Sequence, residues 1–285
     1  MKSSKIWALV LMGGGARGLA HVGVLRVLER NGLMPDVIAG TSMGAIVGGL
    51  FAAGVSGTKL SEMLGGMDLG KAVDKPGRHL FRHSKNLFEY VMLSDYKNRL
   101  MGKMGVDKGD AIESYLKSCV GEVRIEDLPV RFVCNAVDLV TGQEVLFTTG
   151  PLYRALRATM SLPLVFAPVR MGSKLLLDGG VLNSAPVEAA RAAGAEVAVL
   201  VDIHRPLRRM PRDKIKSTFQ IIQRTIEVAS AASFKERALH ADFVLRIPVD
   251  QGVLGFSEPE RIALRGERIA EANLDALKRA IGAAR

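Results

Sequence analysis

The hydrophobic pattern of the chain alternates between short apolar runs and helical periodicity. Residues 6–12 form an uncharged run that stops at three glycines, and residues 19–30 follow with apolar side chains at the spacing of an amphipathic helix. Residues 36–40 are a second apolar run, and residues 43–54 are a second helical segment that ends at a glycine. Strand, glycine turn and helix, repeated in this order, predict parallel strands joined by right-handed crossovers.

The stretch from residue 37 to residue 55 carries no charge and is long enough to cross a bilayer. Within it Gly44, Gly48 and Ala52 recur every four residues, so they share one small-residue face of a helix that can approach a sheet closely. A membrane span has no use for a serine bracketed by glycines. We therefore expect a buried strand, a tight turn and a buried helix.

The same two patterns continue toward the C-terminus. Strands are predicted at residues 130–138, 174–178, 196–203 and 242–249, with a hairpin turn at residues 141–142, and helices at about residues 185–193, 212–240 and 259–284. These elements indicate an α/β protein. The 285 residues are 48% apolar and contain no repeat or linker tract, which predicts a single domain over residues 5–285.

The region around residues 71–110 breaks the pattern. Basic residues alternate with Leu, Phe, Tyr and Met without a clean period, as in a surface insertion, a lid, a membrane-facing segment or ordinary exposed helices. The net charge of +10 favours an anionic partner, either phospholipid headgroups or nucleic acid. Aromatic residues are sparse and no nucleic-acid motif is present, so we expect peripheral contact with an anionic membrane and no nucleic-acid partner.

Cysteine usage and the N-terminal region indicate the compartment. Cys119 and Cys134 are too few for a disulfide framework and lack the spacing of a structural metal site. The apolar run at residues 6–12 is at the short limit for a signal peptide, and a glycine-rich turn follows instead of a cleavage site. We expect a cytoplasmic protein, in peripheral contact with the inner membrane at most, that uses no metal or other cofactor.

Residues 40–44 match G-x-S-x-G, the pattern in which a serine occupies a tight turn between a strand and a helix. About 0.2 such matches are expected by chance in this composition, so the pentapeptide alone is weak. Its context is the one that the motif requires, because an apolar run precedes Ser42 and a helical segment follows. A helix N-terminus at this point would face developing negative charge. The alternative is a loop serine that caps a helix.

Residues 13–18 form a second glycine cluster between a strand and a helix, and they match G-x-G-x-x-G. About 0.3 matches are expected by chance. In a dinucleotide site an acidic residue ends the second strand, whereas Asp36 begins it, so this interpretation is weakened but stays open. The other use of such a loop is to present backbone N–H groups to an oxyanion.

Asp178 ends an apolar run and precedes two glycines. It is either a strand-end carboxylate that reaches an active site or part of an ordinary hairpin turn. His204 follows another predicted strand, so Ser42, Asp178 and His204 reproduce the order of an α/β-hydrolase triad. Against a triad, the serine here follows only the second strand. Both arrangements stay open at this point.

Four blocks in this order resemble the bacterial patatin-like phospholipases. They are the glycine loop at residues 13–18, the serine turn at residues 40–44, a small-residue segment leading into prolines at residues 158–169, and Asp-Gly-Gly at residues 178–180. The resemblance extends over residues 5–203. Residue 159 is Thr where the family usually has Ser, in a segment to which we assign no direct chemistry.

The resemblance implies a three-layer α/β/α fold with a mainly parallel central sheet. It also implies a serine acyl hydrolase of the phospholipase A, lysophospholipase or esterase type, acting on phospholipid or another acyl-ester lipid. Ser42 would be the nucleophile and Asp178 its base, as a dyad without histidine. An aspartate with a pKa of ~4 is a weak base in water, but burial raises its pKa.

The same resemblance assigns the glycine loop. Gly14 and Gly15, together with Gly18, would donate backbone N–H groups to the oxyanion, and Arg17 would hold the loop in place. Loss of one such donor typically costs on the order of 3 kcal/mol in the transition state, so the loop should matter nearly as much as the dyad. A dinucleotide-binding protein, and a regulatory protein whose site is seldom used, remain alternatives.

Overall fold

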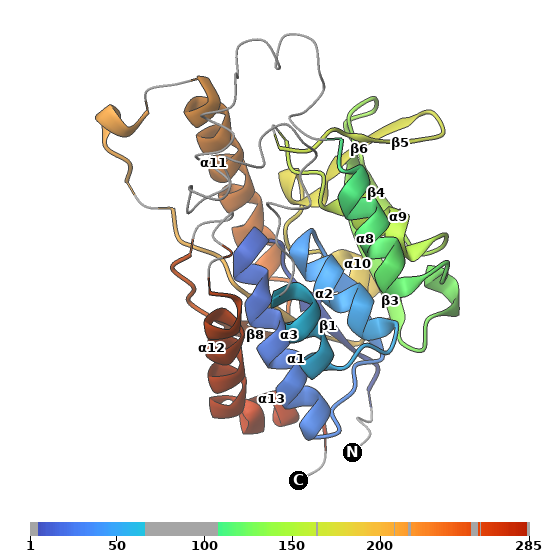
Figure 1. Cartoon of the computed structure of the whole chain (residues 1–285). Helices are drawn as coiled ribbons and strands as arrows, with labels where there is room; N and C mark the ends of the chain where they lie inside the picture. Colours follow the sequence, from blue (N-terminus) through green and yellow to red (C-terminus); the bar gives the residue numbers. More distant parts are fainter. Residues whose placement is uncertain are drawn as a thin grey trace.

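The computed structural model of the chain (Figure 1) describes residues 5–65, 108–163, 165–207, 209–215, 218–251, 256 and 258–283. The predicted insertion around residues 71–110 lies outside these ranges except for its last three residues. One cluster of buried apolar side chains runs from Trp7 to Ala283, so the described residues share one core. A single domain over residues 5–285 stays a prediction for the chain as a whole.

The centre of the described structure is an eight-stranded sheet in the order β5-β6-β3-β2-β1-β7-β8, with β4 paired to β3. The strands are β1 (Trp7–Leu11), β2 (Val37–Gly40), β3 (Arg131–Asp138), β4 (Glu144–Phe147), β5 (Val169–Met171), β6 (Lys174–Asp178), β7 (Val197–Asp202) and β8 (Phe243–Arg246). All pairings from β3 through β2, β1 and β7 to β8 are parallel. The pairings that involve β4, β5 and β6 are antiparallel. The predicted α/β class with a mainly parallel sheet is confirmed.

Helices cover both faces of this sheet. They are α1 (Ala20–Arg30), α2 (Met43–Ala52), α3 (Gly57–Gly65), α8 (Asp110–Val120), α9 (Leu152–Thr159), α10 (Val187–Ala192), α11 (Thr218–Ala238), α12 (Pro259–Ala272) and α13 (Leu274–Ala280), with 3₁₀ turns η1 (Gly15–Leu19), η2 (Ile125–Asp127), η3 (Gly179–Val181) and η4 (Arg212–Lys214). In Figure 1, α1 and α2 lie in front of the sheet and α10 lies behind it, which gives the three-layer arrangement.

Two predicted helices have different limits in the structure. The segment expected to be helical over residues 259–284 is two helices, because α12 ends at Asn273, whose backbone is not helical. The Asn273 side chain donates to the Ile269 carbonyl and so caps this break. The helix expected from residue 212 begins only at residue 218, after the turn η4.

The uncharged stretch from residue 37 to residue 55 is β2, a turn and α2, and every residue of α2 is buried. A Cβ added at Gly44 would lie 2.1 Å from the Leu11 carbonyl oxygen, and one at Gly48 would lie 2.7 Å from Ile38 Cγ2. Small residues on this face therefore let α2 pack directly on β1 and β2. None of the helices in the described part of the chain combines the length and hydropathy needed to cross a membrane.

Helix α12 packs against α1, the helix that follows the glycine loop. An added Cβ at Gly23 would lie 1.9 Å from the Ala263 carbonyl oxygen, and one at Gly266 would lie 1.9 Å from the Ala20 carbonyl oxygen. The two backbones are thus in contact at their crossing. Ion pairs from Arg26 to Glu260 and Glu267 lie beside it. The C-terminal region therefore holds the helix that carries the loop.

Candidate active site

Ser42 occupies the turn between β2 and α2. Its backbone has φ 53° and ψ −125°, and it is the one non-glycine residue with positive φ in the described ranges. This conformation is strained for a residue with a Cβ and occurs mainly at functional sites. The turn is tight, since a Cβ on Gly40 would lie 2.6 Å from Ala45 Cα. The G-x-S-x-G segment thus adopts the strand–turn–helix geometry that its sequence predicts.

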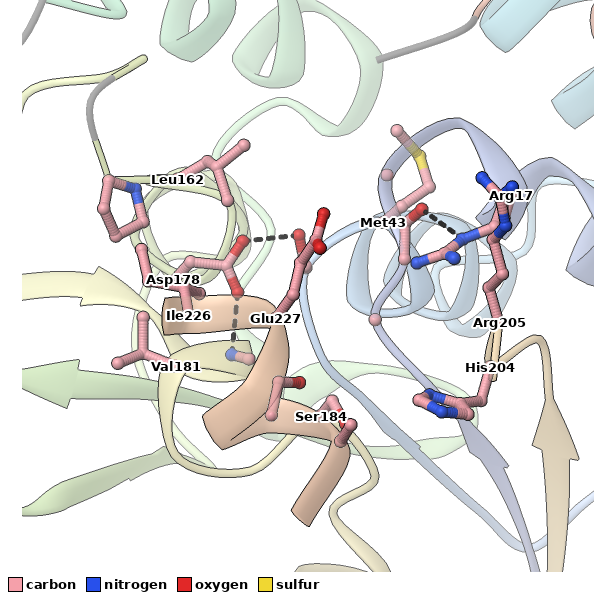
Figure 2. A pocket seen from close by; sticks show the side chains of 18 of the residues that line it. Arg17, Met43, Leu162, Asp178, Val181, Ser184, His204, Arg205, Ile226 and Glu227 are labelled. Atoms are coloured by element: carbon pink, nitrogen blue, oxygen red, sulfur yellow. Dashed lines mark hydrogen bonds between the residues drawn. The ribbon is translucent and has the colours of Figure 1, made fainter. Parts of the chain in front are cut away.

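The Ser42 hydroxyl donates directly to the Asp178 carboxylate, with an Oγ to Oδ2 distance of 2.6 Å. The other carboxylate oxygen of Asp178 accepts the Gly180 N–H at 2.8 Å, and Figure 2 shows Asp178 between these two partners. Asp178 ends β6, which pairs with β3 beside the strand that precedes Ser42. A Cβ on Gly179 would lie 2.3 Å from Asn135 Oδ1, so the turn after Asp178 needs glycine for close packing.

Burial changes the acidity of Asp178. The side chain is almost completely removed from water, and this burial raises the pKa of the Asp178 carboxyl to about 6, against the opposing effect of the hydrogen bonds from Ser42 and Gly180. A carboxylate with a pKa of about 6 accepts a proton far more readily near neutral pH than an aspartate in water. The site thus couples a serine hydroxyl to a base of suitable strength.

Thr159, at the end of α9, contacts the same turn. Its hydroxyl oxygen accepts the backbone N–H of Ser42 at 2.9 Å, so it holds the serine backbone in place. The segment at residues 158–169, to which we assigned no direct chemistry, thus has a positioning contact with the serine turn. The signal available in the sequence was a hydroxyl residue among small residues, and the Thr at this position supplies the same hydroxyl that a Ser would.

A network of buried polar side chains contacts the serine turn through Thr41. No pattern in the sequence predicted this network. Thr41 Oγ1 donates to Asn135 Oδ1 at 2.8 Å. The Nδ2 groups of Asn135 and Asn183 both donate to Glu144 Oε1, at 2.6 and 2.9 Å. This network links β2, β3, β4 and the segment after Asp178. Satisfied buried networks of this kind fix one arrangement of the elements that they join.

The glycine loop lies beside Ser42. The Gly13 N–H donates to the Ser184 carbonyl at 2.8 Å, which fixes the start of the loop. Gly14 and Gly15 both line the cavity that contains Ser42, and Gly15 has a φ of 57°, in the region that favours glycine. Gly18 is buried and is not among the cavity-lining residues; an added Cβ there would lie 2.5 Å from Met43 Cγ.

Arg17 folds back over this loop. Its Nε donates to the Gly14 carbonyl at 3.3 Å, and the side chain is partly buried at the cavity wall (Figure 2). Burial, together with the positive charge of Arg205, lowers the pKa of the Arg17 guanidinium from its usual value. The position fits the predicted role of holding the loop.

The residues of the two rival sites make other contacts. His204 lines the cavity, but its ring stacks on Phe234 at a centroid distance of 4.7 Å, and the Ser42 hydroxyl bonds Asp178 rather than an imidazole. Asp36 accepts the N–H of Trp7 at the start of β1, whereas the glycine loop follows the end of β1. Asp36 therefore lies at the opposite edge of the sheet from the loop, where it cannot bind a ribose held there.

The serine, the carboxylate and the glycine loop face one cavity of about 650 Å³. Apolar side chains from both halves of the chain line it, among them Ile46, Met160, Phe166, Leu207, Ile226 and Phe256.

In the described residues, no three His, Cys, Asp or Glu side chains come together as a metal site would require. Cys119 and Cys134 are free thiols, and burial raises the pKa of both.

A family model described as patatin-like phospholipase matches residues 9–191. The chain belongs to the patatin-like phospholipase family. The matched segment contains the glycine loop, the serine turn, Thr159 and Asp178, which are the parts of the site that meet in the structure. The family resemblance inferred from the four sequence blocks is confirmed.

Curated relatives of this patatin-like chain are longer than it is. An uncharacterized NTE family protein of Mycobacterium tuberculosis is 34% identical over 203 residues, which is 71% of this chain and 50% of the relative. Lysophospholipase NTE1 of Mycosarcoma maydis is 30% identical over 293 aligned residues, covering 94% of this chain and 14% of the relative. The chain thus spans half or less of the length of these relatives.

Among solved structures, full-length ExoU in complex with SpcU, from the type III secretion system of Pseudomonas aeruginosa, is similar with a TM-score of 0.50. The similarity covers 98% of this chain and 53% of that chain at 15% sequence identity. It shows a shared fold.

Proposed function

We propose that this chain is a serine lipid acyl hydrolase that cleaves acyl esters of phospholipids or related lipids through an acyl-enzyme. The observation that carries this proposal is the 2.6 Å hydrogen bond from the Ser42 hydroxyl to the buried Asp178 carboxylate. Three further features support it: the strained serine backbone, the raised pKa of Asp178 and the apolar cavity. Family membership supports the same class of reaction.

The chemistry runs in two steps. Ser42 Oγ attacks the ester carbonyl carbon while its proton passes to Asp178 Oδ2. The tetrahedral intermediate collapses as Asp178 returns that proton to the departing alcohol, which leaves an acyl group on Ser42. A water molecule then attacks the acyl carbonyl with Asp178 again accepting the proton, and the acid departs as Ser42 regains its hydrogen.

The negative charge on the carbonyl oxygen needs donors that are already in place. We assign this role to the N–H groups of Gly14 and Gly15, which line the cavity beside Ser42, since the Gly13 N–H is already bonded to Ser184. Gly18 was expected to be a third donor. Its packing beneath Met43 supports a different role, in which the missing side chain lets the loop approach α2.

The substrate class follows from the cavity and the charge. A largely apolar lining suits an acyl chain, and the net charge of +10 suits an anionic lipid surface. We propose peripheral binding to such a surface from the cytoplasmic side.

A soluble short-chain ester tests the proposed reaction without any membrane. Ser42→Ala and Asp178→Asn should each abolish its hydrolysis while the protein stays folded, and a fluorophosphonate probe should label the wild type but not Ser42→Ala. His204→Gln is the matched control, because it alters a cavity residue that the proposed dyad does not use. Loss of activity in His204→Gln would establish the Ser-Asp-His alternative instead, because that triad needs His204 as its base and the proposed dyad does not.

The same preparation tests the other two alternatives. Saturable thermal stabilisation by NAD(P) or a flavin would favour a dinucleotide-binding protein. Failure of the probe to label a folded wild type would favour an inert scaffold. Either result would contradict the proposed hydrolase.

A further inference from the structure

Apolar side chains are exposed in one region of the chain next to the cavity. This region runs from the end of β7 into the first turns of α11, and its exposed apolar members are Leu207, Met210, Ile215, Ile221 and Ile222, of which Ile221 is 54% exposed. Single exposed apolar residues are common on soluble proteins, whereas a contiguous exposed apolar surface indicates a contact site, and five such residues close together in sequence favour one.

The same region is strongly basic. Residues 205–214 contain five Lys or Arg and one acidic residue, Asp213. Arg205, Arg209 and Arg212 are all exposed. We call these three arginines and the five apolar residues together the rim patch.

The rim patch borders the cavity that contains Ser42. Arg205, Leu207, Arg209 and Met210 are themselves part of the cavity lining. Figure 2 places Arg205 beside Arg17 at one side of the pocket, and Figure 1 shows η4 projecting from the body of the molecule at the end where α11 begins. A surface that covered the rim patch would therefore contact four residues that also line the cavity.

We propose that the rim patch docks this chain on an anionic lipid bilayer, so that a lipid can pass from the bilayer into the cavity. The proposal rests on the hydrolase function proposed above, and it locates the membrane contact in the eight residues of the rim patch. Its apolar side chains would enter the interfacial region while the arginines bind anionic headgroups, which is how basic, amphipathic surfaces bind membranes. Loss of one arginine near an anionic surface weakens binding about fivefold.

A second copy of the chain is a poorer occupant of the same surface. In a two-fold dimer the patch would face itself, and its arginines would meet arginines of the same charge. Such a contact would also cover the mouth of the cavity. An anionic bilayer instead has headgroups of opposite charge for the arginines and an apolar interior for the apolar side chains. It also contains the proposed substrate.

Vesicle sedimentation of the Ser42→Ala protein measures docking without hydrolysis of the lipid. We expect binding to vesicles of phosphatidylglycerol and phosphatidylcholine, weaker binding to phosphatidylcholine alone, and release by salt. The patch variant Arg212→Gln/Ile215→Asn/Ile221→Asn changes only residues outside the cavity lining, and it should lower the partition coefficient at least about tenfold. Leu264→Asn/Arg265→Gln on α12 exchanges the same kinds of exposed residues and should bind within about twofold of the parent.

The readouts separate this inference from the proposed reaction. With Ser42 intact, the patch variant should hydrolyse the soluble ester at the wild-type rate, which also shows that it is folded. If the wild type did not hydrolyse that ester, the hydrolase proposal would be contradicted. The vesicle sedimentation would still test docking independently. Docking on lipid is overturned if the parent does not prefer anionic vesicles, or if the patch variant binds them as well as the parent does. A dimer in size-exclusion chromatography that the patch variant abolishes would also overturn it, in favour of a second copy.

Discussion

The Thr159 hydroxyl accepts the backbone N–H of Ser42 across 2.9 Å, so a residue far from the serine in sequence holds the strained turn. Thr159→Val removes this acceptor and leaves the Ser42 N–H without its partner, a loss that typically costs about 1–3 kcal/mol. We expect a lower free energy of unfolding in urea and roughly tenfold slower ester hydrolysis. Thr159→Ser keeps the hydroxyl and should preserve both the free energy of unfolding and the rate of hydrolysis. A fully active Thr159→Val protein would show that the hydroxyl is not needed to position Ser42.

The strain at Ser42 is itself measurable. Ser42→Ala and Ser42→Gly both delete the hydroxyl, but only glycine adopts φ 53° without a steric penalty. The strain is of the order of 1–3 kcal/mol, and the added flexibility of glycine offsets part of it. Thermal or urea unfolding should show Ser42→Gly to be more stable than Ser42→Ala by about 1 kcal/mol. Equal stability of the two variants would mean that the turn stores no strain.

Hydrolysis should depend on pH through Asp178. Because burial raises the pKa of the Asp178 carboxyl to about 6, and only the carboxylate can accept the serine proton, activity on a soluble ester should fall tenfold per pH unit below about 6. Above that pH it should level off. Burial lowers the pKa of His204, so His204→Gln is the necessary control. The acidic limb should persist in that variant, and its disappearance would assign the limb to histidine.

The raised pKa of Asp178 also makes the free energy of unfolding depend on pH, in the opposite sense from an aspartate whose pKa is lowered by folding. A raised pKa means that the folded protein binds the proton more tightly than the unfolded chain does, so stability falls as pH rises from about 4 to about 6. The cost at neutral pH is about 3 kcal/mol for the shift of roughly two units. Asp178→Asn should therefore unfold at a higher urea concentration than the wild type at pH 7 although it is inactive. This advantage should shrink to nothing near pH 4, and an unchanged advantage at low pH would rule out the raised pKa as its cause.

Because α2 packs directly on β1, adding one methyl group at Gly44 should lower the free energy of unfolding by an unusually large amount. Gly44→Ala would place its Cβ 2.1 Å from the Leu11 carbonyl oxygen, which backbone atoms cannot avoid without moving α2. We expect a loss of about 3 kcal/mol or more in the free energy of unfolding, together with loss of activity. Gly142→Ala is the control: nothing lies within 4 Å of its added Cβ, but its φ of 72° is unfavourable, so the expected cost is only about 1 kcal/mol. Comparable melting temperatures for the two variants would contradict direct contact.

The sequence contained enough to predict the elements that carry the site. The apolar run before Ser42 and the small-residue face after it depend on local pattern alone, and both have the predicted structure. Asp178 ends a strand as its apolar run predicts. That these two residues meet depends on the pairing of β6 with β3, which is a long-range contact.

Other features do not follow from local pattern alone. The acceptor for the Ser42 N–H comes from Thr159, 117 residues away, and the carboxylate of Glu144 joins two asparagines that no motif connects. At the break between α12 and α13, the Asn273 side chain donates to the Ile269 carbonyl, in a segment whose periodicity continues through the break. Polar side chains that meet across strands become visible only once the strands are paired.

The position of β7 limits how this chain could be divided. The family-model match ends at residue 191, but β7 follows it and pairs with β1 from Trp7 to Leu11. A fragment that stopped after the match would turn the middle of the sheet into an open edge, where an unpaired apolar strand invites aggregation. It would also remove Leu207, Ile226 and Phe256 from the cavity wall. The stretch after residue 191 therefore supplies both a strand beside β1 and part of the cavity wall, so an engineer could vary its cavity residues to change specificity but could not omit it.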